Sequence, residues 1–132
     1  MENIKRFLQK DRFAELADIE LLELSEGAAT ARMKVSGKHL NAADIAHGAA
    51  VFTLSDLAFA AASNSHGTLA VAINANISFL KAVREGDILT AQAREVALNP
   101  KLASYEIRVV DQVDDLVAIF QGMVYRKKDP VG

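Results

Sequence analysis

One charged side chain stands alone within a long apolar run of this sequence, and it is the residue best suited to chemistry. From Ala46 to Ala62 the chain has no proline, one glycine (Gly48) near the start, and one charged residue, Asp56. Burying a carboxylate among apolar side chains costs several kcal/mol unless the group is paired or used. We therefore expect Asp56 to be a nucleophile or a general base. The alternative is a buried acid that is satisfied by hydrogen bonds or by a partner subunit.

The second chemical feature is the start of the same apolar run. Backbone N–H groups at a helix N-terminus lack partners and carry the positive end of the helix dipole, so the amide of Gly48 could stabilise a developing oxyanion. Its alternative role is simple helix-start geometry. Asp56 lies eight positions after Gly48, which is roughly 12 Å along one helix at about 1.5 Å per residue. One carbonyl group cannot contact both, so we expect a site shared by two subunits with antiparallel helices side by side.

The elements around this run have the patterns of an antiparallel sheet. Residues 46–62 predict one long buried helix, because apolar side chains occur on all of its sides. A short amphipathic helix is expected from Asn3 to Lys10, and the tail from Lys127 to Gly132 is expected to fray. Period-two alternation and turn residues predict six strands, with the last four forming a meander: Ile19–Leu24, Ala29–Val35, Val71–Phe79, Ile88–Ala97, Ala103–Val110 and Val117–Tyr125.

These elements predict an α+β fold in one domain spanning residues 1–132. A six-stranded sheet has one face to bury, and only the helix at 46–62 is long and apolar enough to cover it. The sheet should therefore curve around that helix. Because open edge strands pair readily with a second copy, we expect at least a homodimer.

Composition excludes several classes of function. The 15 Lys and Arg residues against 17 Asp and Glu leave a net charge of only −2, which argues against nucleic acid and acidic membranes as partners. The chain has no cysteine, so disulfides and thiolate chemistry are excluded, and an intracellular, cytoplasmic location is expected. No signal-peptide core or membrane span is predicted. Three scattered histidines predict no metal site.

The pattern around the two chemical residues resembles a known family. An Asn, a spaced His-Gly-Gly element and an acid in the helix are characteristic of the hotdog-fold acyl-CoA thioesterases of the PaaI-like group, named for phenylacetic acid degradation. Here the matching residues are Asn41, His47, Gly48 and Asp56. Similar segments follow at Ile77–Ala82 with Gly86 and Asp87, and at Phe120–Arg126. Two positions depart from the pattern: Ala49 replaces the second glycine, and Asp44 replaces a glycine between the Asn and the His.

The resemblance implies roles for further residues. Asn41 and His47 would position the thioester carbonyl or the lytic water on the Gly48 side, although either could simply cap the helix or fix the loop. Asn74 falls where the family often carries a Ser or Thr near the acid. Apolar side chains near Asp56 would bind the acyl group, and three basic residues could bind the phosphates of coenzyme A. The expected acyl-binding residues are Phe52, Thr53, Phe59 and Ala60, and the basic residues are Lys81, Arg84 and Lys101.

The resemblance also implies a fold, a substrate and an assembly. It implies the hotdog fold, with a curved antiparallel sheet of about six strands wrapped around one central helix. The implied reaction is hydrolysis of an acyl-CoA thioester, with an aryl-acetyl or medium-chain acyl group. Coenzyme A would enter as part of the substrate, and no other cofactor is expected. By family analogy, the homo-oligomer would be a tetramer made of two dimers.

Two other functions are compatible with the same fold. One is a non-catalytic module that binds or senses acyl-CoA, which the presence of Asp56 disfavours. The other is a hotdog hydratase or dehydratase, which is disfavoured because the chain lacks the His-Phe-Pro element and the His and Asp motif of those groups.

Overall fold

The structure, a computed structural model, describes residues 1–132 of the chain. Two short helices open the chain, a 3-10 turn and a long helix follow the first hairpin, and four strands complete the fold. The elements are α1 (Glu2–Leu8), α2 (Arg12–Leu16), β1 (Glu20–Ser25), β2 (Ala28–Lys34), η1 (Gly37–His39), α3 (Gly48–Asn64), β3 (Thr68–Phe79), β4 (Ile88–Leu98), β5 (Leu102–Val110) and β6 (Leu116–Pro130).

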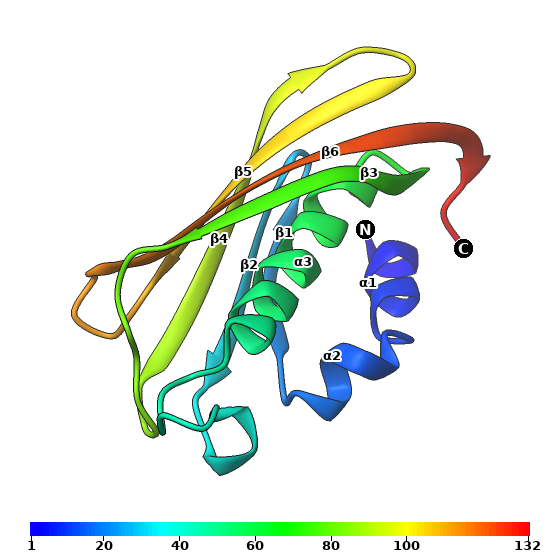
Figure 1. The fold of residues 1–132 in the computed structure, drawn as a ribbon. Helices are drawn as coiled ribbons and strands as arrows, with labels where there is room; N and C mark the ends of the chain where they lie inside the picture. The colour runs from blue at the N-terminus through cyan, green and yellow to red at the C-terminus, as the bar shows by residue number, and fades with distance from the viewer.

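The six strands form one antiparallel sheet in the order β1-β2-β4-β5-β6-β3. Figure 1 shows the sheet curving around α3, which lies in its concave side. The expected hotdog arrangement is thus confirmed. The expected four-strand meander is correct only for β4, β5 and β6, because β3 crosses the sheet and pairs with β6 while β4 pairs with β2. Tight turns are local signals, whereas the partner of β3 is chosen by contacts far away in the sequence.

Helix α3 begins and ends through side-chain hydrogen bonds. At its start the ring Nδ1 of His47 accepts a hydrogen bond from the N–H of Ala49 at 3.0 Å. At its end the side chain of Asn64 donates to the carbonyl of Ala60 and accepts from the N–H of Ala70, which fixes the start of β3. Gly67 then reverses the chain with φ +85°. The helix therefore starts and ends two residues later than expected.

The core lies between α3 and the concave face of the sheet. Alanines and larger apolar side chains of α3 are buried against residues from five strands. A group of aromatic rings joins the helix to the sheet, since Phe59 lies 5.4 Å from Phe120 and 5.9 Å from Tyr105 between ring centroids. Gly122 allows this contact, because a Cβ atom there would lie 2.6 Å from the ring of Phe59. The helix is thus held at close range by both small and aromatic residues.

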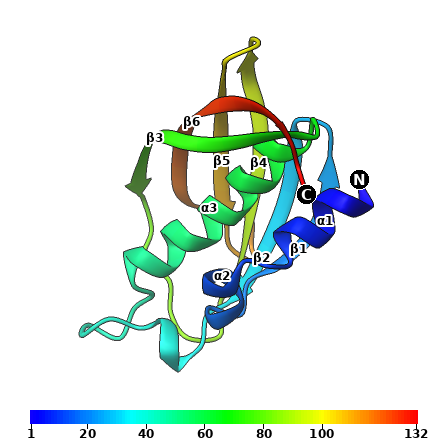
Figure 2. The same ribbon diagram turned by 90° about the vertical axis from the view of Figure 1, so that its right-hand side faces the viewer.

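Helices α1 and α2 cover part of α3 beside the β1 edge of the sheet, as Figure 2 shows. The sequence predicted α1 but not α2 or η1. Asp11 caps α2 by accepting a hydrogen bond from the N–H of Ala14. His39 of η1 is buried, and its Nε2 lies 2.7 Å from the carbonyl of Ala17 at the end of α2. This contact connects the first helical layer to the loop that leads into α3.

Two further expectations about the ends of the sheet are wrong. Strict alternation would place Val71, Ile73, Ala75, Ile77 and Phe79 on one face of β3. The bulge between Ala72 and Asn74 breaks this alternation, so that Val71 pairs with Tyr125 on the outer face, and Val71 and Ile73 are 41% and 55% exposed. The C-terminal tail does not fray: β6 continues to Pro130, and Val131 is buried with its N–H bonded to the carbonyl of Gly67. The tail is rich in charged residues, so its sequence has no apolar pattern that would predict this packing.

Candidate active site

Asp56 is a half-buried carboxylate without a partner. It lies in the middle of α3, and its side chain forms no hydrogen bond or ion pair within the chain. Burial raises the pKa of Asp56 above its usual value, and the nearby negative charge of Asp11 raises it further. The structure of one chain thus does not satisfy this acid, which removes the alternative of intramolecular hydrogen bonds and leaves the carboxylate available for chemistry.

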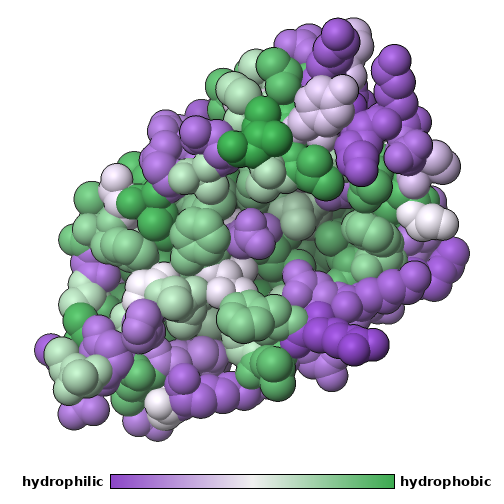
Figure 3. Space-filling view, turned by 45° about the vertical axis from the view of Figure 1, so that its right-hand side comes forward, coloured by the Kyte–Doolittle hydropathy of each residue, from purple (hydrophilic) through white to green (hydrophobic).

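The only incompletely buried stripe of α3 carries Asp56. Positions at helical spacing fall on one face, and the other residues of the helix centre are packed in the core. Figure 3 shows a molecular face on which apolar side chains gather in a broad band with hydrophilic atoms at its centre. The stripe would present an acid surrounded by apolar surface to anything that lies against it. Its members are Ala49, Phe52, Thr53, Asp56 and Ala60.

Phe59 is a correction to the expected acyl-binding set. Its side chain is only 1% exposed, since it points from α3 into the aromatic group beneath Gly122. It therefore supports the helix from the core and cannot line a site for a substrate. Two other members of the expected set, Phe52 and Ala60, remain on the accessible face of α3.

Gly48 is the first residue of α3 and offers a free backbone donor. The N–H of Ala49 bonds to the His47 ring, and the N–H groups of Ala50 and Val51 bond to the His47 carbonyl. The N–H of Gly48 has no acceptor in the chain. It is thus the single unsatisfied donor of the first helical turn, at the positive end of the helix dipole. Glycine is not required by the backbone, because Gly48 does not have a positive φ.

His47 and Asn41 both make structural contacts and both keep one free nitrogen. The Nδ1 of His47 accepts a backbone N–H, so the neutral ring carries its proton on Nε2, which has no partner. The side-chain oxygen of Asn41 accepts the N–H groups of Ala43 and Ile45 and closes the loop, while its Nδ2 makes no hydrogen bond. Each residue therefore shapes the approach to Gly48 and retains a donor.

The two departures from the family pattern do not disturb this loop. Asp44 has a φ of +60°, the left-handed conformation that glycine favours and that Asp tolerates better than most residues. Ala49 is an ordinary helical residue of α3. The loop thus keeps the backbone that a glycine would allow.

Asn74 lies apart from the helix stripe. It pairs with Met123 next to a bulge in β3, while its neighbour Ala75 pairs with Gly122, which faces Phe59 and α3. Side chains alternate across a strand, so Asn74 points to the outer face. There it lines a cavity of about 320 Å³ with residues of β4, β5 and β6. A single chain therefore does not place Asn74 near Asp56.

The predicted basic residues do not form a common phosphate site. The amine of Lys81 bonds to the carboxylates of Asp111 at 2.5 Å and Asp115 at 2.8 Å, and these contacts hold the pKa of Lys81 well above its usual value. Arg84 and Lys101 are exposed on separate loops. Lys81 is thus committed to fixing the loop after β5.

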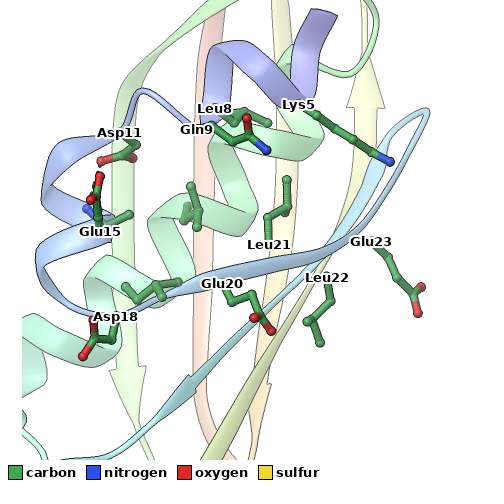
Figure 4. A pocket seen from close by; sticks show the side chains of 13 residues that line it. Lys5, Leu8, Gln9, Asp11, Glu15, Asp18, Glu20, Leu21, Leu22 and Glu23 are labelled. Carbon is green, nitrogen blue, oxygen red and sulfur yellow. Dashed lines mark hydrogen bonds between the residues drawn. The ribbon is translucent and has the colours of Figure 1, made fainter. Parts of the chain in front are cut away.

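A cavity lies beside the site rather than in it. It has a volume of about 590 Å³, and Figure 4 shows it between α1, α2 and β1. Leu57 of α3 lines it, but neither Asp56 nor Gly48 does. Asp11, which the sequence analysis did not identify, lines this cavity, and its negative charge also raises the pKa of Asp56. Its position as a helix N-cap is a signal that could have revealed it.

Other kinds of site find no support in the chain. No group of three or more His, Asp or Glu side chains is arranged to hold a metal ion. None of the helices has the length and apolar character that crossing a membrane requires. What the geometry does offer is an unpaired acid, an unpaired backbone N–H and an apolar surface on one helix.

Comparison with known proteins identifies the family of this chain. The family model of the thioesterase superfamily matches residues 43–118. A protein named "Putative esterase" from Archaeoglobus fulgidus is 46% identical over 96% of this chain and 82% of its own length. The acyl-coenzyme A thioesterase PaaI of Escherichia coli is 35% identical over 95% of this chain and 89% of its own length.

Solved structures show the same family relationship. The structure of E. coli PaaI, from the phenylacetic acid degradation operon, superposes with a TM-score of 0.95, 34% identity, and coverage of 99% of this chain and 95% of that one. The smu.793 protein of Streptococcus mutans, solved with acetyl-CoA bound, gives a TM-score of 0.81, 26% identity, and coverage of 85% and 90%. The chain belongs to the thioesterase superfamily, and within it to the PaaI-like hotdog proteins. It is a thioester hydrolase.

Proposed function

We propose that this enzyme hydrolyses acyl-CoA thioesters at a site formed by Asp56 of one subunit and the Gly48 N–H of another. The observation that carries the proposal is that neither the Gly48 N–H nor the Asp56 carboxylate has a hydrogen-bond partner in the chain. The name of E. coli PaaI and the acetyl-CoA bound to the S. mutans protein support coenzyme A as the leaving group.

The chemistry follows from the two groups. The Asp56 carboxylate removes a proton from water, whose oxygen attacks the thioester carbon, or it attacks that carbon itself. The carbonyl electrons move onto oxygen, where the Gly48 N–H stabilises the charge. The intermediate then expels the thiolate of coenzyme A, which takes up a proton, and a carboxylic acid is released. In the direct route, water first hydrolyses the anhydride formed with Asp56. No metal or organic cofactor takes part in these steps.

The accessible stripe of α3 supports an apolar acyl group. Phe52 and Ala60 flank Asp56 on this face, and Ala49 and Thr53 extend it towards the start of the helix. No cation lies against Asp56 to select a charged acyl group. We therefore propose an aryl-acetyl or medium-chain substrate, with the free nitrogens of His47 and Asn41 helping to place the thioester near Gly48.

The role of Asp56 is tested by replacing it with asparagine. The Asp56→Asn variant keeps the shape of the side chain but cannot act as a base or a nucleophile, so kcat should fall by about 10² to 10⁴ or more. Steady-state hydrolysis of a panel of CoA thioesters measures the effect. Full activity across the panel would refute the proposal, and tight acyl-CoA binding by the wild type without turnover would indicate a binding module instead.

A matched pair of substitutions isolates the Gly48 N–H. Proline is tolerated at the first position of a helix and replaces the N–H by a ring Cδ atom, and the ψ of 137° at His47 suits a residue that precedes proline. Gly48→Ala adds a similar Cβ and keeps the N–H. We expect Gly48→Pro to lower kcat by about 10² to 10³ relative to Gly48→Ala. Equal rates for the two variants would show that this N–H is not the oxyanion donor.

A further inference from the structure

Phe79 is a large aromatic residue that packs against Gly48 while half of its surface is open. It is the last residue of β3, and its side chain is 53% exposed. A Cβ atom on Gly48 would lie 2.9 Å from the tip of the Phe79 ring and 3.4 Å from two further ring atoms. Because the backbone of Gly48 does not need glycine, the ring of Phe79 explains why this position has no side chain.

The register of β3 places Phe79 on the same face as the catalytic helix. Ile77 pairs with Phe120 and Phe79 pairs with Ala118, and both partners are buried in the core. Phe120 in turn contacts Phe52 of the accessible stripe at 5.1 Å between ring centroids. Phe79 thus extends an aromatic wall along α3 as far as its N-terminus, where the wall becomes open to solvent.

We propose that Phe79 is a specificity-determining residue that flanks the Gly48 donor and limits the space beside the thioester carbonyl. This inference rests on the proposed role of Gly48 as an oxyanion donor. The ring leaves no room for a methyl group on Gly48 itself, so a branch on the acyl carbon next to the carbonyl would meet the same ring. The enzyme therefore prefers acyl groups that are unbranched at that carbon.

The ring also shapes the environment of the donor. The ring lies against the side of Gly48 where a Cβ atom would project. An aromatic side chain this close to the donor residue excludes water from part of its surroundings, which strengthens a hydrogen bond to a developing charge. Phe79 would thus act on both acyl selection and catalysis without carrying a reactive group.

The test compares two substrates that differ only by branching, butanoyl-CoA and 2-methylpropanoyl-CoA. Phe79→Ala should raise the ratio of kcat/KM for the branched over the unbranched substrate by about tenfold or more, the size of effect that one methyl group has in an apolar site. Phe79→Leu should give a smaller rise, because it keeps part of the volume. Tyr125→Ala is the matched control, since it removes a 42% exposed ring from the outer face of β6.

An unchanged ratio in both Phe79 variants would overturn the inference, as would an equal rise in the Tyr125 control. Light scattering shows whether a variant keeps the wild-type assembly. If Phe79→Ala does not keep it, the ratio of kcat/KM measured for Phe79→Leu is used to judge the inference. The Asp56→Asn variant is measured in parallel. If that variant remains fully active, the proposed function fails; if it is inactive while the Phe79 ratio is unchanged, only the role of Phe79 fails.

A second measurement does not depend on activity. Gly48→Ala should lower the melting temperature in the wild type, because the added methyl group meets the Phe79 ring. The same substitution in a Phe79→Ala background should have no such effect. Equal losses in both backgrounds would show that the contact between the two residues does not exist in solution.

Discussion

The charged form of Asp56 destabilises the folded state of the protein. It occupies an otherwise apolar stripe, burial and Asp11 both disfavour its charged form, and no hydrogen bond offsets this. Such a group lowers stability at neutral pH and persists where function requires it. The same electrostatics places the acid limb of the pH–rate profile above the usual range of an aspartate.

The cost of Asp56 should be visible in the pH dependence of stability. Its pKa is raised in the folded state, so the folded chain holds a proton that the unfolded chain loses near pH about 3.9. Stability therefore falls as the pH rises through the folded pKa. Asp56→Asn, which carries no charge, should be more stable than the wild type at pH 7 by about 0.5–2 kcal/mol.

This gain should shrink towards pH 4 and vanish below it, where the wild-type acid is protonated. Melting temperatures of both proteins across this range provide the measurement. A constant difference between them at all pH values would mean that the charge of Asp56 is not the cause.

At the scale of elements, the position of α3 depends on a glycine in β6 rather than on the helix alone. A Cβ atom at Gly122 would lie 2.6 Å from the ring of Phe59, and that ring is held in place by Tyr105 and Phe120. The ring has nowhere to move, because it is almost completely buried. The close approach of β6 to α3 therefore sets the depth of the helix in the sheet.

Gly122→Ala should accordingly destabilise the protein by about 1–3 kcal/mol through overpacking. Gly37→Ala is a suitable control, because a Cβ atom there meets nothing within 4 Å, and its effect should stay within about 0.5 kcal/mol. Urea denaturation of the three proteins measures the difference. If both variants were equally stable, the packing described between Phe59 and β6 would be incorrect.

The elements that sequence predicted are those with a local signal. The apolar run around Asp56 predicted α3, and alternation predicted all six strands, although β6 continues to Pro130 rather than ending at Tyr125. The pairing of β3 with β6 had no local signal, because it is decided by long-range packing. The same limit applies to the candidate site. Residue types were enough to propose Asp56 and Gly48, but the contact of Phe79 with Gly48 and the burial of Phe59 are visible only in the fold.

At the scale of the whole molecule, the proposed mechanism requires a site that a single chain does not complete. Gly48 and Asp56 lie roughly 12 Å apart along one straight helix, too far for both to contact one carbonyl group. Edge strand β3 carries exposed apolar side chains, including Val71 and Ile73, and such an edge favours pairing with a second copy. These two features together support a dimer in which each site uses Asp56 from one subunit and Gly48 from the other.

Mixed oligomers test this shared site most directly. Subunits carrying Asp56→Asn and subunits carrying Gly48→Pro would be co-expressed with different affinity tags, and the mixed species purified by both tags. Each variant alone should be nearly inactive. A mixed dimer contains one site with both wild-type groups and one with neither, so it should recover about half of the wild-type kcat per dimer. Mixed oligomers that remain as inactive as the separate variants would contradict a site shared between subunits.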